Sequence, residues 1–260
     1  LRFAALANVP PWAPFFPAAY HQGSAPAFAL ALEAADLAVE AFSTASSLRT
    51  ARQNLITEIE RHAKVLEEVG ERLGNIYQVE FKGLDFTLAP FPQPEKSIGN
   101  ALERLGLPAF GLAGSLAAST FLTDTLDKAS YKRTGFNGLM LPVLEDSTLA
   151  QRATQGLLNI QDLLLYSSVC GTGLDTIPLP GDTSVDQLYA VLLDLAALSL
   201  RLNKPLTARL MPIPGKAAGD DTGFDFEFFA NSKILALQSG SLIGLLNGCE
   251  TFEVQSRNHN

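Results

Sequence analysis

The sequence predicts an α/β fold made of serial strand–helix units, whose strands form a parallel sheet or a barrel. Three segments run from an apolar strand through a proline and a short loop into a polar helix start: TLAPFPQPEKS, LMLPVLEDS and TIPLPGDTS. Proline ends a strand because it has no N–H to donate to the neighbouring strand, and Asp, Ser or Thr then caps the next helix. PLPGD at 178–182 and PIPGK at 212–216 repeat this exit. Such serial units are typical of parallel sheets and barrels.

The individual elements follow from local patterns along the chain. In order, the expected strands are 2–9, 84–88, 136–141, 174–179 and 206–213, and the expected helices are 27–42, 48–73, 97–105, 112–128, 148–158, 160–169 and 183–202. The strongest helical periodicity belongs to 48–73, whose apolar stripe consists of Leu48, Leu55, Ile59, Leu66, Val69 and Leu73. After Gly223 the pattern is less clear, although FDFEFF and KILAL could be strands.

Composition excludes several classes of protein. The 260 residues are 47% hydrophobic and only 18% charged, against about 25% charged in ordinary soluble chains, which excludes a disordered chain, collagen and a coiled coil. This apolar composition fits a buried core or contacts between subunits, so we expect a homo-oligomer. The net charge of −8 and the lack of a Lys/Arg cluster exclude a nucleic-acid binder. Prolines and glycines interrupt every long uncharged stretch, so no membrane span is predicted.

Domain organisation and location follow from length and cysteine content. A chain of this length is commonly a single barrel domain, which we expect over residues 1–260. The sequence starts without Met on the strand-like RFAALANV, so we expect further residues upstream in a longer chain. Its two cysteines, Cys170 and Cys249, cannot form a disulfide framework and fit a reducing, cytoplasmic setting, although one bridge stays possible.

The proline loops predict where a ligand would bind. In parallel α/β folds, ligands bind beside the carboxyl ends of the strands, where these loops gather Glu145, Asp146, Asp182 and Lys216, together with Glu95. Glu145, Asp146 and Asp182 could hold Mg²⁺ or Ca²⁺, since these ions prefer carboxylate oxygens. The alternative is that the acidic residues only cap helices.

Further candidates come from residues in unusual surroundings. His21 follows a strand in an aromatic, proline-rich loop and could be a general acid or base, or a structural histidine. Cys170, between glycines and a helix, could be a nucleophile or an inert buried thiol. Arg209 falls inside an apolar strand, so it should be paired or functional. With Lys216 it would suit a carboxylate or phosphate group.

An ordered series of segments resembles a known family. PFFPAAYH, ALEAADLA, LDFTLAPFP, SIGNALERLG, FNGLMLPVLED, VCGTGLDTIPLPGDTS and TARLMPIPGKAAGD are similar to those of the uncharacterised domain of unknown function 711. The resemblance implies a ten-stranded barrel of parallel βα units, like that of pyruvate formate-lyase and the glycyl-radical enzymes. Glycyl-radical chemistry itself is not expected, because the C-terminal GLLNGCETFEVQSRNHN lacks the glycine loop that bears the radical.

Three functions remain open. The first is an enzyme that acts on a small anionic metabolite, held by Arg209 and Lys216, with His21 and Cys170 or Asp182 doing acid–base or nucleophilic work. A separate possibility is a divalent-metal enzyme that uses Glu145, Asp146 and Asp182, which Mg²⁺ or Ca²⁺ would stabilise and anions would not. The second is a non-catalytic metabolite-binding or oligomeric scaffold protein that kept the fold and lost the radical.

Overall fold

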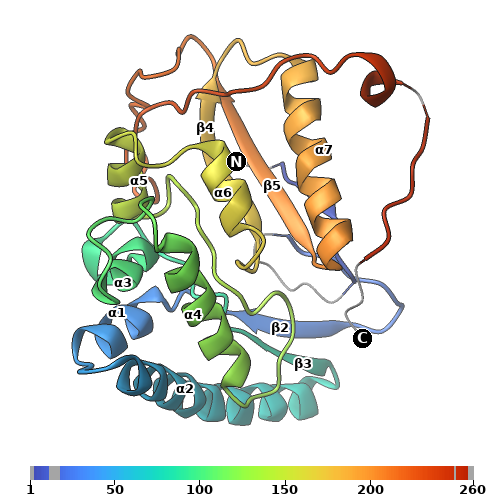
Figure 1. Cartoon of the computed structure of the whole chain (residues 1–260). Helices are drawn as coiled ribbons and strands as arrows, with labels where there is room; N and C mark the ends of the chain where they lie inside the picture. Colours follow the sequence, from blue (N-terminus) through green and yellow to red (C-terminus); the bar gives the residue numbers. More distant parts are fainter. Residues whose placement is uncertain (1–2, 12–17, 249, 257–260) are drawn as a thin grey trace.

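Five strands form two small sheets in the computed structural model, which describes residues 3–11, 18–248 and 250–256. One sheet has the order β1-β5-β4, with β4 and β5 parallel and β1 antiparallel to β5. The other consists of the parallel pair β2 and β3. The strands are β1 (Ala5–Ala7), β2 (Ala27–Ala31), β3 (Glu80–Asp85), β4 (Gly173–Pro180) and β5 (Leu206–Ile213). In Figure 1, β4 and β5 lie beside α7 at the top, and β2 and β3 lie near α2 at the bottom.

The structure contradicts the predicted ten-stranded barrel of the pyruvate formate-lyase type, because the described strands form no closed barrel. The segment expected as a strand at 136–141 makes no continuous ladder with either sheet. Next to it, isolated bridges join only Leu84 to Arg133 and Pro142 to Asp175. The left-handed backbone of Asn137, with a φ of 46°, interrupts the extended conformation that a strand needs. Pro142, directly after the segment, has no N–H to donate to a neighbouring strand.

The helix expected over 27–42 is also wrong in its first part. Residues 27–31 form β2, which pairs with β3, and the helix α1 begins only at Ala35. The alanine-rich sequence is compatible with both structures, and the pairing with β3 decides between them. The two late strands are wrong as well: within the described part of 221–237, only an isolated bridge between Asp221 and Lys233 forms.

Seven α-helices and two short 3₁₀ helices complete the described chain. They are α1 (Ala35–Ser43), α2 (Leu48–Tyr77), α3 (Ile98–Arg104), α4 (Ser115–Lys128), α5 (Ser147–Thr154), α6 (Ile160–Tyr166), α7 (Val185–Leu202), η1 (Pro94–Lys96) and η2 (Gly244–Asn247). The predicted helix at 48–73 is confirmed as α2, which Ser47 caps through a capping box with Thr50. Within the described residues, no helix is both long and apolar enough to cross a membrane.

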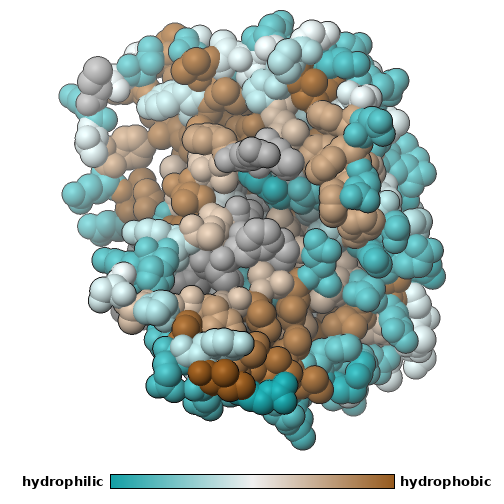
Figure 2. Space-filling model, turned by 180° about the vertical axis from the view of Figure 1, so that it is seen from behind, coloured by the Kyte–Doolittle hydropathy of each residue, from teal (hydrophilic) through white to brown (hydrophobic). Residues whose placement is uncertain are grey.

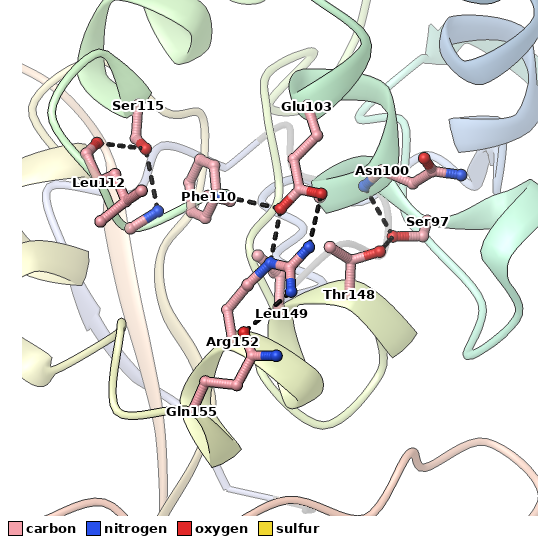
Figure 3. Close-up of polar contacts among 12 residues, drawn as sticks. Ser97, Asn100, Glu103, Phe110, Leu112, Ser115, Thr148, Leu149, Arg152 and Gln155 are labelled. Carbon is pink, nitrogen blue, oxygen red and sulfur yellow. Dashed lines mark hydrogen bonds and ion pairs between the residues drawn. The ribbon is translucent and has the colours of Figure 1, made fainter. Parts of the chain in front are cut away.

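Two close contacts fix the arrangement around the later strands. A Cβ on Gly138 would lie 2.2 Å from the Cα of Gly171, so only glycines allow these two segments to touch. Helices α3 and α5 are joined by a two-pronged ion pair in which Arg152 donates to both carboxylate oxygens of Glu103 at 2.7 Å (Figure 3). Glu103 also accepts from the N–H of Phe110 at 2.7 Å, which attaches the loop after α3 to the same pair.

Candidate functional site

A buried cluster of three charged side chains forms where β4, β5 and the segment before α5 meet. Arg209 on β5 donates through Nε and Nη2 to the two carboxylate oxygens of Asp175 on β4, the second at 2.8 Å. The same Nη2 donates to Glu145 Oε2 at 2.9 Å. The side chains of Arg209, Glu145 and Asp175 are 15%, 22% and 0% exposed. The pairing expected for a charge in a buried strand is therefore present at Arg209.

An irregularity in β4 presents Asp175 to this cluster. The β4–β5 register shifts between Leu174 and Ile177, so β4 contains one residue more than β5 over this stretch. Thr176 in the shift has a φ of 42°, which is unfavourable for a β-branched side chain and costs on the order of 1–3 kcal/mol. Bulges of this kind redirect side chains and are common beside active sites.

The bulge also anchors the segment that carries Glu145. The Val143 N–H donates to the Asp175 carbonyl at 3.1 Å, and the Leu144 N–H donates to the Thr176 hydroxyl at 3.3 Å. The strained residue and its neighbour thus hold the backbone immediately before Glu145. Two carboxylates from different segments are in this way fixed on the same guanidinium.

The electrostatics of the cluster favour a protonated Glu145. Burial, with repulsion from Asp175, raises the pKa of Glu145 to about 7 against the attraction of Arg209, and Glu33 adds a smaller repulsion. Burial lowers the pKa of Arg209, but the attraction of Asp175 and Glu145 outweighs it and the net pKa is raised. Arg209 therefore keeps its charge, while Glu145 can gain or lose a proton near neutral pH.

Asp146, predicted as a metal ligand or a cap, is a cap. It is fully buried and is the N-cap of α5. Its Oδ1 accepts from Thr148 N, Leu149 N and Ser97 Oγ, and its Oδ2 accepts from the N–H groups of residues 98 and 99 at the start of α3. Burial raises the pKa of Asp146 and these hydrogen bonds lower it. Its two oxygens thus bind two helix N-termini.

The predicted Mg²⁺ or Ca²⁺ site gains no support from the part of the chain that the structure describes. In that part, no group of three or more His, Cys, Asp or Glu side chains is arranged to hold a metal ion. Asp146 is engaged with backbone donors, and Glu145 is bound to Arg209. The metal site therefore stays a prediction.

The remaining candidates lie in separate places. Cys170 precedes β4 and Asp182 follows it, so the two residues lie at opposite ends of that strand. Cys170 is 1% exposed, and its sulfur accepts from the N–H of Gly173 at 3.3 Å. Asp182 is exposed. Lys216 lies in the turn after β5, where its carbonyl accepts from Gly181 N, so the turns that carry Lys216 and Asp182 lie side by side.

His21 is exposed in a groove of about 710 Å³ near the starts of β2 and β3, whose lining contains neither Cys170 nor Asp182. Cys249 lies outside the described residues. The catalytic and anion-binding roles given to His21, Cys170, Asp182, Arg209 and Lys216 stay predictions.

Comparison with known proteins identifies the family. A family model described as uncharacterised ACR (DUF711) matches residues 1–231. The chain belongs to this family. A UPF0210 protein of Pyrobaculum aerophilum is 34% identical over 84% of this chain and 51% of its own length. A UPF0210 protein of Methanopyrus kandleri is 32% identical over 85% and 50%, and one of Oleidesulfovibrio alaskensis is 38% identical over 60% and 34%.

The resemblance to the domain of unknown function 711 is thus confirmed, but it extends over only part of the relatives. The chain spans about half the length of the curated relatives from Pyrobaculum and Methanopyrus that it matches. The family description states no activity. Any function therefore has to be argued from the residues of this chain.

Sequence reasoning found two members of the buried cluster in this DUF711 chain and missed the third. Arg209 and Glu145 were singled out, but Asp175 was not. The signal was available, because Asp175 stands in the apolar strand GLDTIPLP just as Arg209 stands in LTARLMPI. A carboxylate in a buried strand needs a partner for the same reason as a guanidinium does. In the complete cluster, the Glu145 carboxyl has a pKa near neutrality and is held by the Arg209 guanidinium, which also binds the Asp175 carboxylate.

Proposed function

We propose that this DUF711 member is an enzyme that moves a proton to or from a small molecule bound beside Glu145, Asp175 and Arg209. The single observation that carries the proposal is the buried ion cluster on a strained bulge. Its three side chains come from three separate segments, and both carboxylates lie within hydrogen-bonding distance of the Arg209 guanidinium. Strain and buried charge of this kind are concentrated at functional sites.

The roles follow from the contacts of each side chain. Glu145 is the proton-exchanging group, and its Oε2 accepts the hydrogen bond from Arg209, so Oε1 is the oxygen that carries the proton. The neutral carboxyl gives this proton to a basic atom of the substrate and becomes a carboxylate, and the reverse step restores it. Arg209 and Asp175 are positioning residues, because they orient Glu145 and set its charge. A pKa of about 7 for Glu145 suits both directions near neutral pH.

The charge of the cluster favours a neutral or positively charged substrate over the anion that the sequence suggested. Two carboxylates face one guanidinium, and Glu33 lies close enough to raise the pKa of Glu145 further. Both Nε and Nη2 of Arg209 are already bound to carboxylates. An anion would have to displace one of these partners, and once Glu145 is ionised it would also meet two carboxylates around a single guanidinium.

A thermal-shift screen with four classes of small molecule tests the proposal: carboxylates, phosphates, primary amines and neutral polyols. A ligand present at a hundred times its Kd adds about 2.7 kcal/mol to stability, which raises the Tm of a chain of this size by about 5–10 °C. We expect such a shift from an amine or a neutral compound, its loss in Glu145→Gln, and its retention in Glu103→Gln. The Glu103 variant is the matched control, because it alters an ion pair of similar burial between α3 and α5.

Two outcomes would overturn the proposal. One is stabilisation by an anion that persists in Glu145→Gln. The other is the absence of any shift with all four classes, which would favour the alternative of a non-catalytic scaffold protein. A compound that passes the first test then serves as the substrate candidate in an assay of solvent hydrogen exchange, in which Glu145→Gln should lower the exchange rate at least tenfold.

A further inference from the structure

Residues 222–232, which include the aromatic sequence FDFEFF, form a loop that is closed by hydrogen bonds of its own side chains. The Oδ1 atom of Asn231 accepts from the Thr222 hydroxyl at 2.8 Å and from the Phe224 N–H at 2.7 Å. The amide group of Asn231 donates to the Phe224 carbonyl at 2.9 Å. Thr222 N–H donates to the Ser232 carbonyl at 2.9 Å, and Ser232 N–H donates to the Thr222 hydroxyl at 3.0 Å. Asn231 is exposed, so it closes the loop without belonging to the core.

Two further contacts attach this loop to neighbouring elements. The Ser232 hydroxyl donates to the Ala150 carbonyl of α5 at 3.2 Å. Phe228 packs edge-on against Phe91, which follows β3, with ring centroids 5.7 Å apart. In Figure 1 the loop accordingly lies beside α5, at the upper left. The hydrophobic side chains that Figure 2 shows in the lower half of the rear face lie at the level of β2 and β3, away from this loop.

A third contact attaches the loop to the peptide group that leads into Glu145. The Ala230 N–H donates to the Leu144 carbonyl at 2.7 Å. Because a peptide group is planar, this bond fixes the Glu145 nitrogen together with the carbonyl. On the other side, the Leu144 N–H donates to Thr176 Oγ1 in the bulge of β4 at 3.3 Å. Leu144 is fully buried, and its donor and its acceptor are thus both held, one by β4 and one by the loop.

We propose that the 222–232 loop is a clamp that positions Glu145 for proton transfer, with Asn231 as the positioning residue that keeps the clamp closed. The inference rests on the proposed function, in which Glu145 is the proton-exchanging group. The clamp acts through the backbone, because Ala230 holds the peptide group from which residue 145 begins. Within the described part of the chain, the side chain of Asn231 bonds only to Thr222 and Phe224, so it acts on Glu145 through the loop.

The charges around Glu145 make its position measurable. Burial and repulsion from Asp175 on β4 raise the pKa of Glu145 to about 7. Glu33, before α1, adds a smaller repulsion, and Arg209 on β5 acts in the opposite direction. The raised pKa therefore depends on Glu145 staying buried beside Asp175. If the clamp opens, water reaches the carboxyl and its pKa falls toward the ordinary value of 4.5.

Carboxyl ¹³C NMR of the whole chain, prepared with labelled glutamate, tests the clamp. The signal of Glu145 is identified by its absence in Glu145→Gln, and its titration midpoint is then followed in Asn231→Ala. We expect the midpoint to fall by about one pH unit or more relative to the unaltered chain. Asn159→Ala is the matched control, because Asn159 is also exposed and bonds to Asp162 at the start of α6. In that variant the midpoint should stay unchanged.

Ala230→Pro is a second and more direct test. Proline has no N–H to donate to the carbonyl of residue 144, so this variant should lower the midpoint at least as far as Asn231→Ala. The acids of the loop, Asp225 and Glu227, are exposed and are kept in both variants, so a change in their charge cannot produce the shift.

The proposal fails if the midpoint in Asn231→Ala equals that of the unaltered chain, wherever that midpoint lies. It also fails if Asn159→Ala lowers the midpoint by as much, because the effect would then not come from the loop. Asn231→Ala decides the matter if Ala230→Pro does not fold, since an exposed side chain can be replaced without disturbing the core. The titration uses no ligand, whereas the thermal-shift screen does, so failure of the clamp is distinguishable from failure of the proposed function.

Discussion

Replacement of Asp146 by asparagine tests how strongly one buried carboxylate joins α3 to α5. Its Oδ1 accepts three hydrogen bonds and its Oδ2 accepts two, the latter from Ile98 N at 2.6 Å and Gly99 N at 3.2 Å. Asparagine can keep the Oδ1 bonds through its carbonyl, but its NH₂ group then faces two buried N–H donors. Each buried donor without a partner costs about 1–3 kcal/mol, so Asp146→Asn should lower the free energy of unfolding by about 2–6 kcal/mol.

Urea unfolding followed by circular dichroism measures this loss. Asp162→Asn is the control, because Asp162 stands in the first turn of α6 but is only half-buried, and its carboxylate accepts from the Asn159 side chain near the surface. Surface substitutions of this kind change stability by about 0.5 kcal/mol. If Asp146→Asn lost no more stability than Asp162→Asn, the view that Asp146 joins the two helices would be refuted.

Three further outcomes follow from single residues. The pKa of Glu145 is raised from 4.5 to about 7, so the folded state binds this proton more tightly than the unfolded state does. The free energy of unfolding should therefore fall as pH rises from about 4.5 through 7, by up to about 3 kcal/mol. Glu145→Gln should remove this part of the pH dependence, which urea unfolding at a series of pH values measures. Gly171→Ala would bring a Cβ to 2.4 Å from a backbone atom and should cost at least about 3 kcal/mol in thermal unfolding, whereas Gly240→Ala, with no atom within 4 Å, should be nearly neutral. Cys170 is 1% exposed, so in a Cys249→Ser background an aromatic disulfide reagent should label it only as fast as the chain unfolds. Immediate labelling would favour the nucleophile over the inert buried thiol.

Local chemistry predicted the helices better than the strands. The apolar stripe predicted α2 from its first residue. The polar turn before α7 predicted a cap, which is formed by Ser184 with Gln187. These signals depend on neighbours in sequence, so they are visible without the fold. The strand at 27–31 depends on β3, which lies some fifty residues away along the chain, and its alanines gave no local preference that could exclude a helix.

The site was predictable to the extent that buried charge was visible in the sequence. Arg209 was expected to be paired or functional because it interrupts an apolar strand, and its contacts confirm that it is paired. Asp146 could be either a ligand or a cap on the sequence alone, since both roles use an acidic residue before a helix. Only its burial and its five donors decide for the cap. The left-handed backbone at Thr176 had no sequence signal, because threonine is unfavourable there.

The internal repeat contained the missing partner of Arg209. PLPGD begins at Pro178 and PIPGK begins at Pro212, and the residues three positions before these prolines are Asp175 and Arg209. In the structure, Gly173 pairs with Thr207 and Leu174 with Ala208, which is the same offset as that of the repeat, so the next residues in register are Asp175 and Arg209. Opposite charges at equivalent repeat positions of neighbouring parallel strands are therefore brought together by the register alone. The bulge that follows changes the offset by one residue and leaves the pair in place beside Glu145, so the repeat determines the ion pair and the bulge determines what it faces.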